Sequence, residues 1–488
     1  MDKQAFFMDK KLLLKTIFSL AVIAVFWFLP PVGEITVIGM RTIGVFIGTV
    51  LLLSLVDTTW PVFLSFVLLS LTGVMTINEV LAGSLGNWII TFVILSFVLT
   101  AALNEAGFTS RLTAWFMTRK FVSKSPWAFV YAFWAISAIV GMFMDQVPAS
   151  AFFLGFSAKI LQQLGYGKKE RFSHMLTIGA VFAVNIGGAS TPISHSLALL
   201  GMGIYEKATG QAISMFTYMA FGVPAGIVTF ILMCILLRIL MRPDMSRFSK
   251  LNVKEIVGEI KPMDLKEKTV VTVFGITVVM WILPGLMALF LPADNAALVF
   301  LKQFSITFWA LLAVVVLALI RINDTPIVNL KKTLEQGFPW CVILFISIGV
   351  LLGSAVSSDK VGLSEFVSNN LTPLVGDMPP MIIVLIFALA TTVITNFSSN
   401  VTTITVMTGV AVAVANSIPS LNPVALALTT TMCGSLAFVL PSSFAPIAML
   451  HMDENSDGGA VIRYGSLMVV ISSVAVALIS YNLIAAMA

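Results

Sequence analysis

The stretch TNFSSNVTTITV, residues 395–406, decides how the rest of this chain is interpreted. It lies within Met381–Leu450, a run that contains no Asp, Glu, Lys, Arg or His. Hydroxyl and amide side chains in such a run are costly to bury in hydrocarbon unless protein shields the backbone or a water-filled cavity solvates it. Interrupted helices whose ends point at a solute meet this condition. The stretch therefore predicts a binding site at membrane depth.

The composition indicates a membrane protein with many spans. Hydrophobic residues make up 58% and charged residues 10% of the 488 residues, and the mean hydropathy is +1.01. The apolar run 12–31 lacks a small-residue cleavage site, so we expect a span there and no removable signal peptide. The three cysteines lie in apolar runs and predict neither a disulfide framework nor a metal site. The net charge of +5 comes with Lys and Arg in loops, and nucleic-acid binding is not indicated.

Long apolar runs predict an all-α polytopic membrane protein with about 11 transmembrane helices plus two re-entrant hairpins. Lys and Arg are frequent in the N-terminal segment and in Thr109–Lys124, so both are predicted to be cytoplasmic. The C-terminus is then outside, and the expected location is the plasma (inner) membrane. The predicted spans are 12–31, 36–56, 60–76, 88–106, 172–203, 214–241, 269–292, 297–320, 337–356, 423–450 and 461–486.

The first predicted hairpin, 127–165, lies between two basic loops, Thr109–Lys124 and KKER at 168–171. Basic loops on both sides require an even number of crossings or none. The polar break DQVPAS, 145–150, lies at the midpoint of this run. Two full spans would leave the break as an outside turn, whereas a re-entrant hairpin would bury it; we favour the hairpin.

The second predicted hairpin, 380–418, contains the opening stretch and starts and ends outside. Because the two hairpins enter from opposite sides, the chain is predicted to be an inverted repeat. The expected parts are an N-terminal cytoplasmic arm and first span 1–31, a first repeat 32–250, a cytoplasmic connector 251–268 and a second repeat 269–488. The first repeat would contain the inner hairpin 127–165 and a broken helix 172–203, and the second the outer hairpin 380–418 and a broken helix 423–450.

Each repeat also carries a second interruption, NIGGASTPISHS at 185–196 and CGSLAFVLPSSFAP at 433–446. The spacing agrees between the repeats, because Ser399 follows Asp145 by 254 residues and Pro441 follows Pro192 by 249. Paired Gly/Pro interruptions at corresponding positions of two halves indicate a transporter binding site. Helices that break there leave free N–H groups at their N-termini, which favour anions.

Three patches carry a family resemblance: KKERFSHMLTIGAVFAVNIGGASTPI at 168–193, TNFSSNVTT at 395–403 and LAFVLPSSFAP at 436–446. They resemble the divalent anion/sodium symporter family of dicarboxylate and citrate carriers. The resemblance implies a homodimer with a fixed scaffold and a transport domain that moves as an elevator. It also implies that the hairpin tips and unwound loops bind two substrate carboxylates and sodium ions.

The chain departs from the family pattern at three places. Asp145-Gln146-Val147 stands where the family has its first Ser-Asn-Thr, and Val401 replaces the Thr of the second. Ser194-His195-Ser196 stands where Gly-Thr-Pro-Pro-Asn is common. The lost hydroxyls put the sodium site and the carboxylate contact of the first tip in doubt, so no cofactor is expected and coupling Na⁺ is doubtful.

The candidate site residues come from both tips and both second interruptions. The predicted substrate-binding residues are Gln146, Val147, Pro148, Ser190, Thr191, Pro192, His195, Ser399, Asn400, Val401, Thr402, Pro441, Ser442 and Ser443. The predicted ion or coupling residues are Asp145, Gly187, Gly188 and Asn396.

The candidate residues can also be explained by packing or local hydrogen bonding in place of solute or ion binding. Gly187 and Gly188 fit close helix packing, and hydroxyls near Ser399 fit bonding to their own helix carbonyls. Asp145 fits a solvated turn if its loop lies outside the membrane, although an intramembrane carboxylate is a functional candidate by default. His195 is the natural partner for Asp145 or for substrate, and it also fits a packing role.

The predicted function is secondary active transport of small di- or tricarboxylate anions such as succinate, malate, citrate or 2-oxoglutarate. We favour sodium-independent exchange. The alternatives are a sodium-coupled dicarboxylate symporter and a cation or proton antiporter with Asp145 as ion carrier. An integral membrane enzyme or assembly protein would need a nucleophile–base pair or a metal cluster, and only Asp145 and His195 approach that. The expected partners are the anionic metabolite, the lipid bilayer and a second copy of the chain, without nucleic acid.

Overall fold

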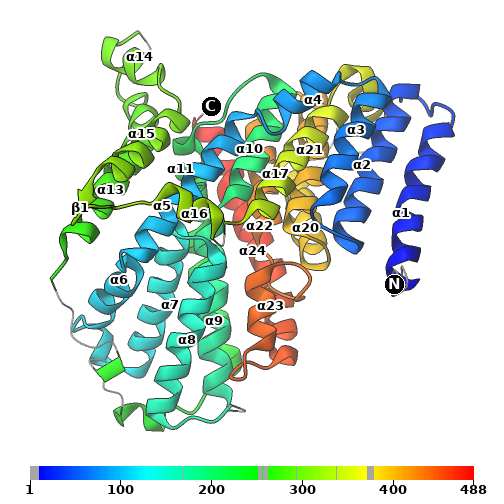
Figure 1. The fold of residues 1–488 in the computed structure, drawn as a ribbon. Helices are drawn as coiled ribbons and strands as arrows, with labels where there is room; N and C mark the ends of the chain where they lie inside the picture. Colours follow the sequence, from blue (N-terminus) through cyan, green and yellow to red (C-terminus); the bar gives the residue numbers. More distant parts are fainter. Residues whose placement is uncertain are drawn as a thin grey trace, which may run out of the picture.

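The computed structural model describes residues 10–487 except 169, 251–254, 257–261, 293, 337 and 371–377. Apart from one two-stranded hairpin, the described regular elements are helices (Figure 1). Ten of them are long and apolar enough to cross a membrane. The pair α14 and α15 adds an eleventh if it forms one span. The predicted class, an all-α polytopic membrane protein, is confirmed.

Four N-terminal helices lie at one side of the molecule, at the right of Figure 1. They are α1 (Lys10–Phe28), α2 (Val37–Leu55), α3 (Trp60–Thr72) and α4 (Ile77–Gly83). Only 11% of the apolar window of α1 is buried in the protein, as expected of a helix that faces lipid on most sides. These helices share a small core with α17 (Trp340–Val356), in which Leu52, Leu69 and Leu351 are buried. In place of the span predicted at 60–76, the structure has the shorter helix α3, of 13 residues.

The other elements precede or separate, in the sequence, the two helix sets described below. They are α5 (Trp88–Glu105), α6 (Phe108–Met117), η1 (Val122–Lys124), η2 (Ser246–Lys250), α13 (Leu265–Met287), α14 (Ala296–Lys302), α15 (Ile306–Leu319), β1 (Arg321–Ile322), β2 (Thr325–Pro326), α16 (Leu330–Glu335), η3 (Asp359–Val361) and α18 (Leu363–Asn370). The span predicted at 297–320 is bent by 71° between α14 and α15. The two helices begin separately, α14 after its N-cap Asn295 and α15 after Ser305.

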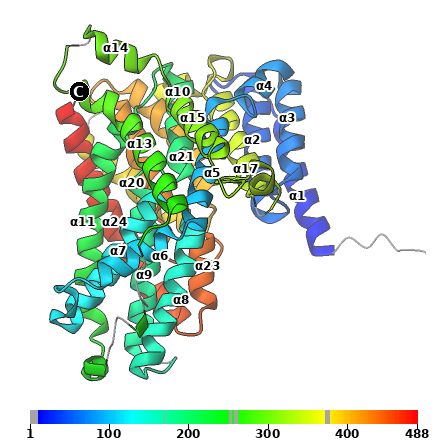
Figure 2. The same ribbon diagram turned by 60° about the vertical axis from the view of Figure 1, so that its left-hand side comes forward.

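The centre of the molecule contains the same sequence of helices twice. The first set is α7 (Pro126–Phe143), α8 (Gln146–Leu164), α9 (Arg171–Ala189), α10 (Ser196–Thr209) and α11 (Met215–Met241). The second set is α20 (Pro380–Phe397), α21 (Asn400–Ser417), α22 (Pro423–Ser435), α23 (Ala445–Met452) and α24 (Gly458–Met487). Each set has a break within its first helix pair and an unwound segment within its second. In Figures 1 and 2, α7, α8, α9 and α23 extend together toward one end of the molecule.

Small residues allow α7 and α9 to pack closely. Their backbones approach so closely that a Cβ on Gly187 would overlap the carbonyl oxygen of Ala138, and a Cβ on Gly141 would overlap that of Val184. Gly179 similarly makes room for the indole of Trp134, whose Nε1 donates to the Leu176 carbonyl at 3.2 Å. Such small-residue contacts are a common way to pack helices in membranes. The glycines of α9 therefore hold the first hairpin against the first broken helix.

Candidate solute-binding cavity

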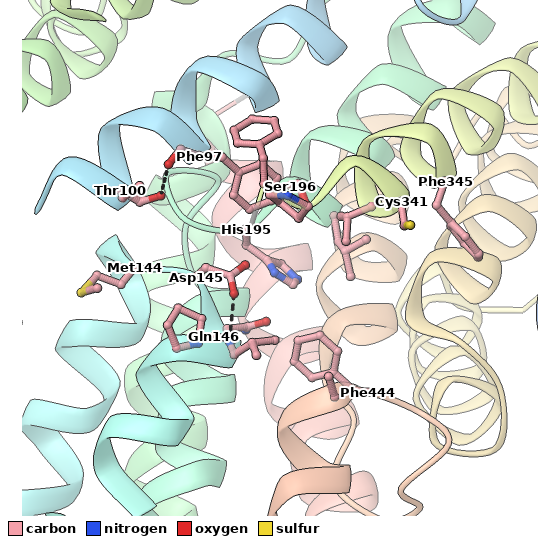
Figure 3. A pocket seen from close by; sticks show the side chains of 18 of the residues that line it. Phe97, Thr100, Met144, Asp145, Gln146, His195, Ser196, Cys341, Phe345 and Phe444 are labelled. Atoms are coloured by element: carbon pink, nitrogen blue, oxygen red, sulfur yellow. Dashed lines mark hydrogen bonds between the residues drawn. The ribbon is translucent and has the colours of Figure 1, made fainter. Parts of the chain in front are cut away.

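A cavity of about 760 Å³ lies where the breaks of both helix sets meet. Its wall includes both first-pair breaks, at Asp145 and Ser399, and both unwound segments, at His195 and Pro441. Figure 3 shows Asp145 and His195 beside each other at this space, with Phe444 opposite them. The predicted site residues that line it are Asp145, Gln146, Val147, Pro148, His195, Ser399, Asn400, Val401, Pro441, Ser442 and Ser443.

The other predicted site residues lie outside this wall. They are Gly187, Gly188, Ser190, Thr191, Pro192, Asn396 and Thr402. Pro192 lines a much smaller neighbouring cavity of about 10 Å³. Gly188 packs against the Gln146 amide, which a Cβ at this position would overlap. For Gly187 and Gly188 the observed contacts fit the packing interpretation.

Buried amides hold the unwound segment of the second set. Asn396 Oδ1 accepts hydrogen bonds from the main-chain N–H groups of Phe438 and Val439 at 2.6 and 2.9 Å, and its Nδ2 donates to the Leu436 carbonyl at 3.2 Å. Asn400 Nδ2 donates to the Ser435 carbonyl at 3.4 Å, while its Oδ1 accepts from Thr395 at 2.8 Å. Unpaired main-chain groups in a membrane interior are costly. These amides therefore replace the helical hydrogen bonds that the break removes.

The N-terminus of α21 lies at the cavity, and among the described residues its N-cap side chain accepts no hydrogen bond from the first-turn N–H groups. The first-turn N–H groups of a helix have no intrahelical acceptors. Ser399 occupies the N-cap position of α21, and in the described part of the chain its side chain makes no capping hydrogen bond. Because Ser399, Asn400 and Val401 all line the cavity, this helix end offers N–H groups and a partial positive charge to a solute anion.

The N-terminus of α8, in contrast, carries its own carboxylate. Asp145 is the N-cap of α8, and its Oδ1 accepts from the Val147 N–H at 3.0 Å. Gln146 follows, and its Nε2 donates to the Asn185 carbonyl at 3.2 Å. Asn185 in turn donates to the Ala437 carbonyl at 2.5 Å. The first tip is thus joined to the unwound segment of the other half.

The unwound segment of the first set is held mostly through its hydroxyls. Thr191 donates to the Met142 carbonyl at 2.6 Å and Ser194 to the Gly141 carbonyl at 2.7 Å, both at the end of α7. Ser190 donates to the Ile186 carbonyl of its own helix at 2.7 Å. These hydroxyls are already engaged. His195 differs, because it lines the cavity and is only 4% exposed, yet its Nε2 has no hydrogen-bond partner among the described residues.

Part of the cavity wall could not be foreseen from the breaks. It comes from α5, α16, α17 and the segment between α16 and α17, including Phe97, Glu105, Lys332, Phe338 and Phe345. Lys332 lies on the short helix α16, and nothing in the basic sequence around it indicates contact with a cavity. Within the described ranges, no cluster of three or more His, Cys, Asp or Glu side chains is arranged to hold a metal ion.

The repeated helix–break–helix architecture around one cavity defines a membrane transporter fold. The sequence profile described as citrate transporter matches residues 44–431, which include the first helix set and the second set as far as α22. The chain belongs to this citrate transporter family, and the predicted relationship to the divalent anion/sodium symporters is confirmed. It is accordingly a transporter and not an enzyme.

Two sodium-dependent dicarboxylate transporters match most of the chain. The chain is 22% identical to the sodium-dependent dicarboxylate transporter SdcS of Staphylococcus saprophyticus, over 86% of this chain and 81% of that protein. It is 24% identical to the sodium-dependent high-affinity dicarboxylate transporter 3 of Caenorhabditis elegans, over 79% of this chain and 72% of that protein. Human solute carrier family 13 member 2 is 33% identical over a shorter region, 30% of this chain and 24% of the human protein.

Two solved structures share the fold. The YdaH transporter of Alcanivorax borkumensis superposes with a TM-score of 0.56 at 14% identity, over 97% of each chain. MtrF of Neisseria gonorrhoeae superposes with a TM-score of 0.59 at 14% identity, over 98% of this chain and 95% of that one. At this identity the likeness establishes the arrangement of helices alone.

Proposed function

We propose that this protein is a secondary active transporter of small di- or tricarboxylate anions. The observation that carries the proposal is the uncapped N-terminus of α21, which opens at Ser399 and Asn400 into a cavity between the two helix sets. Such a helix end suits a carboxylate. The names of SdcS and of the Caenorhabditis elegans relative, both dicarboxylate transporters, support the same class of solute.

Sodium-independent exchange is the coupling mode that we favour. The first tip carries Asp145 and Gln146, and the Gln146 amide is occupied by Asn185. Sodium symport is the second candidate, because SdcS and the Caenorhabditis elegans relative are both named as sodium-dependent. A cation or proton antiporter with Asp145 as ion carrier is the third candidate, because Asp145 lies on the cavity wall.

The transport movement that we propose is an elevator within a homodimer. Both breaks and both unwound segments would move as one body, because Asn185 and Ala437 join the two halves across it. The helices α1 to α5 and α17 would form the frame. Glu105 lines the cavity and is exposed, and it lies next to the segment Thr109–Lys124, which is predicted to be cytoplasmic. The cavity would therefore be open to the cytoplasmic side of the plasma (inner) membrane.

Uptake into proteoliposomes tests this function. Labelled succinate, malate, citrate and 2-oxoglutarate would be offered with and without sodium, and with or without unlabelled dicarboxylate inside. Exchange predicts uptake that requires internal dicarboxylate and persists without sodium. Uptake that requires external sodium would establish symport instead. Failure with every carboxylate would contradict the proposed function.

A further inference from the structure

We propose that the preferred solute carries an ammonium or similar N–H donor group in addition to carboxylate. This group would bind between Asp145 and His195 at the first tip. The inference rests on the proposed function and narrows its substrate class to amino-bearing carboxylates. The juxtaposition that supports it is an acidic first tip and an electropositive second tip on one cavity.

The two tips differ in what they offer a solute. At the second tip, the first turn of α21 is open and Ser399 leaves its N–H groups without a side-chain cap. At the first tip, the corresponding position of α8 is taken by the carboxylate of Asp145, which accepts the Val147 N–H. The anion subsite that a bare helix end would form is already filled there. At the two first-pair breaks a solute thus meets one open helix end, at Ser399, and one carboxylate, at Asp145.

Asp145 lacks a cationic partner in the described part of the chain. The ion pairs within these ranges are Arg111–Glu267, Lys168–Glu454, Arg247–Glu170 and Lys266–Glu105. Within the described ranges its side chain accepts a hydrogen bond from its own helix end, the Val147 N–H. A carboxylate at this depth is costly unless it is paired. A solute that approaches with only negative groups would add repulsion, whereas an ammonium group would supply the missing positive charge.

The buried side chain of His195 also offers a hydrogen-bond acceptor to a solute in this cavity. Its ring is 4% exposed and lines the same cavity, yet its Nε2 has no partner among the described residues. Figure 3 shows the His195 ring and the Asp145 carboxyl group on the same side of the cavity. A buried ring nitrogen without a partner is costly. As the neutral tautomer, His195 would accept one N–H of the ammonium group through Nε2, and Asp145 would accept another.

The two subsites together define the solute. A carboxylate would bind at Ser399 and the start of α21, and the ammonium group would bind at Asp145 and His195. Aspartate and glutamate have both groups, whereas succinate and glutarate have the same carbon skeletons without the nitrogen. The comparison of these two pairs isolates the proposed contact.

Initial uptake of the four labelled anions into proteoliposomes with the full chain tests the inference. We expect wild type to take up aspartate over succinate, and glutamate over glutarate, by about tenfold or more at equal low concentration. Asp145→Asn keeps a good N-cap for α8 but removes the charge, so it should reduce this preference at least about tenfold. His195→Ala should reduce it in the same direction.

The matched control is Asp264→Asn, the same change at the N-cap of α13, where Asp264 accepts the Glu267 N–H at 2.7 Å outside the cavity. It should leave the preference unchanged. Uptake of succinate and glutarate without an amino preference would overturn the inference while the proposed function stands. A proton or sodium dependence that Asp145→Asn abolishes, with no effect on amino selectivity, would also overturn it. Uptake of none of the four would count against both.

Discussion

At the scale of single residues, side-chain amides solve the problem that the breaks create. Asn396 alone satisfies two N–H groups and one carbonyl of the unwound segment, at Phe438, Val439 and Leu436. Its role was predicted from the sequence as ion coupling, and the structure places it in the support of the cavity wall. An Asn within an apolar run indicates that its amide is buried, but the sequence does not show to which main-chain groups the amide forms hydrogen bonds.

Replacing Asn396 with Ala should therefore destabilise the protein strongly. Three buried main-chain contacts are lost, and each unsatisfied group costs about 1–3 kcal/mol; with partial rearrangement we expect a loss of about 2–4 kcal/mol. Thermal unfolding in detergent measures the change. The matched control is Asn482→Ala, since Asn482 is exposed on α24 and donates only to Leu478 of its own helix. Equal stability of the two variants would contradict the assignment.

Ser399 is expected to act on solute affinity and not on folding. Ser399→Asp would place a carboxylate at the start of α21, as Asp145 does at α8, and the helix would remain capped. The new charge would fill the anion subsite, so uptake of labelled anion should fall by about tenfold or more, through a raised KM. Ser399→Asn is the neutral cap control and should retain more uptake. An Asp variant as active as the Asn variant would show that no anion binds at this helix end.

At the scale of elements, polar residues and prolines within apolar runs correctly predict where the helices break. Asp145 and Ser399 both stand at a helix N-terminus facing the cavity, as the interruptions in the sequence predict. The bend between α14 and α15 was not predicted, because the run 297–320 is apolar over most of its length. Ser190 and Thr191 lie outside the wall of this cavity, and their hydroxyls donate to main-chain carbonyls. A sequence does not show whether a hydroxyl bonds to a nearby carbonyl or to a ligand.

The contact between α7 and α9 should be sensitive to one methyl group. Gly187→Ala would push a Cβ into the Ala138 carbonyl, and separating the helices should cost about 1–3 kcal/mol. Gly155→Ala on α8 is the matched control, because nothing lies within 4 Å of its added Cβ. That change should stabilise by up to about 1 kcal/mol through helix propensity. Thermal unfolding of both variants decides, and a Gly187 variant as stable as wild type would contradict the close packing.

At the scale of the whole molecule, one cavity is built by segments from both halves of the chain. The order of spans, interruptions and basic loops was enough to predict this repeat. The wall formed by Phe97, Lys332 and Phe345 was beyond prediction, because it depends on how α5, α16 and α17 are placed against the breaks. The electropositive tip at Ser399 and the acidic tip at Asp145 then assign different roles to two ends that occupy equivalent positions in the repeat.

Solute protection of cysteines on both halves is the most direct test that one solute lies between them. In a Cys341→Ser background the remaining cysteines, Cys234 and Cys433, are buried. Single cysteines would replace Val147 and Ser442, which are exposed cavity residues from different halves, and exposed Asn482 as a control. We predict that a transported anion slows thiol labelling at both cavity positions together and leaves position 482 unchanged. Labelling unaffected at both positions 147 and 442, or slowed equally at 482, would contradict a shared binding site between the halves.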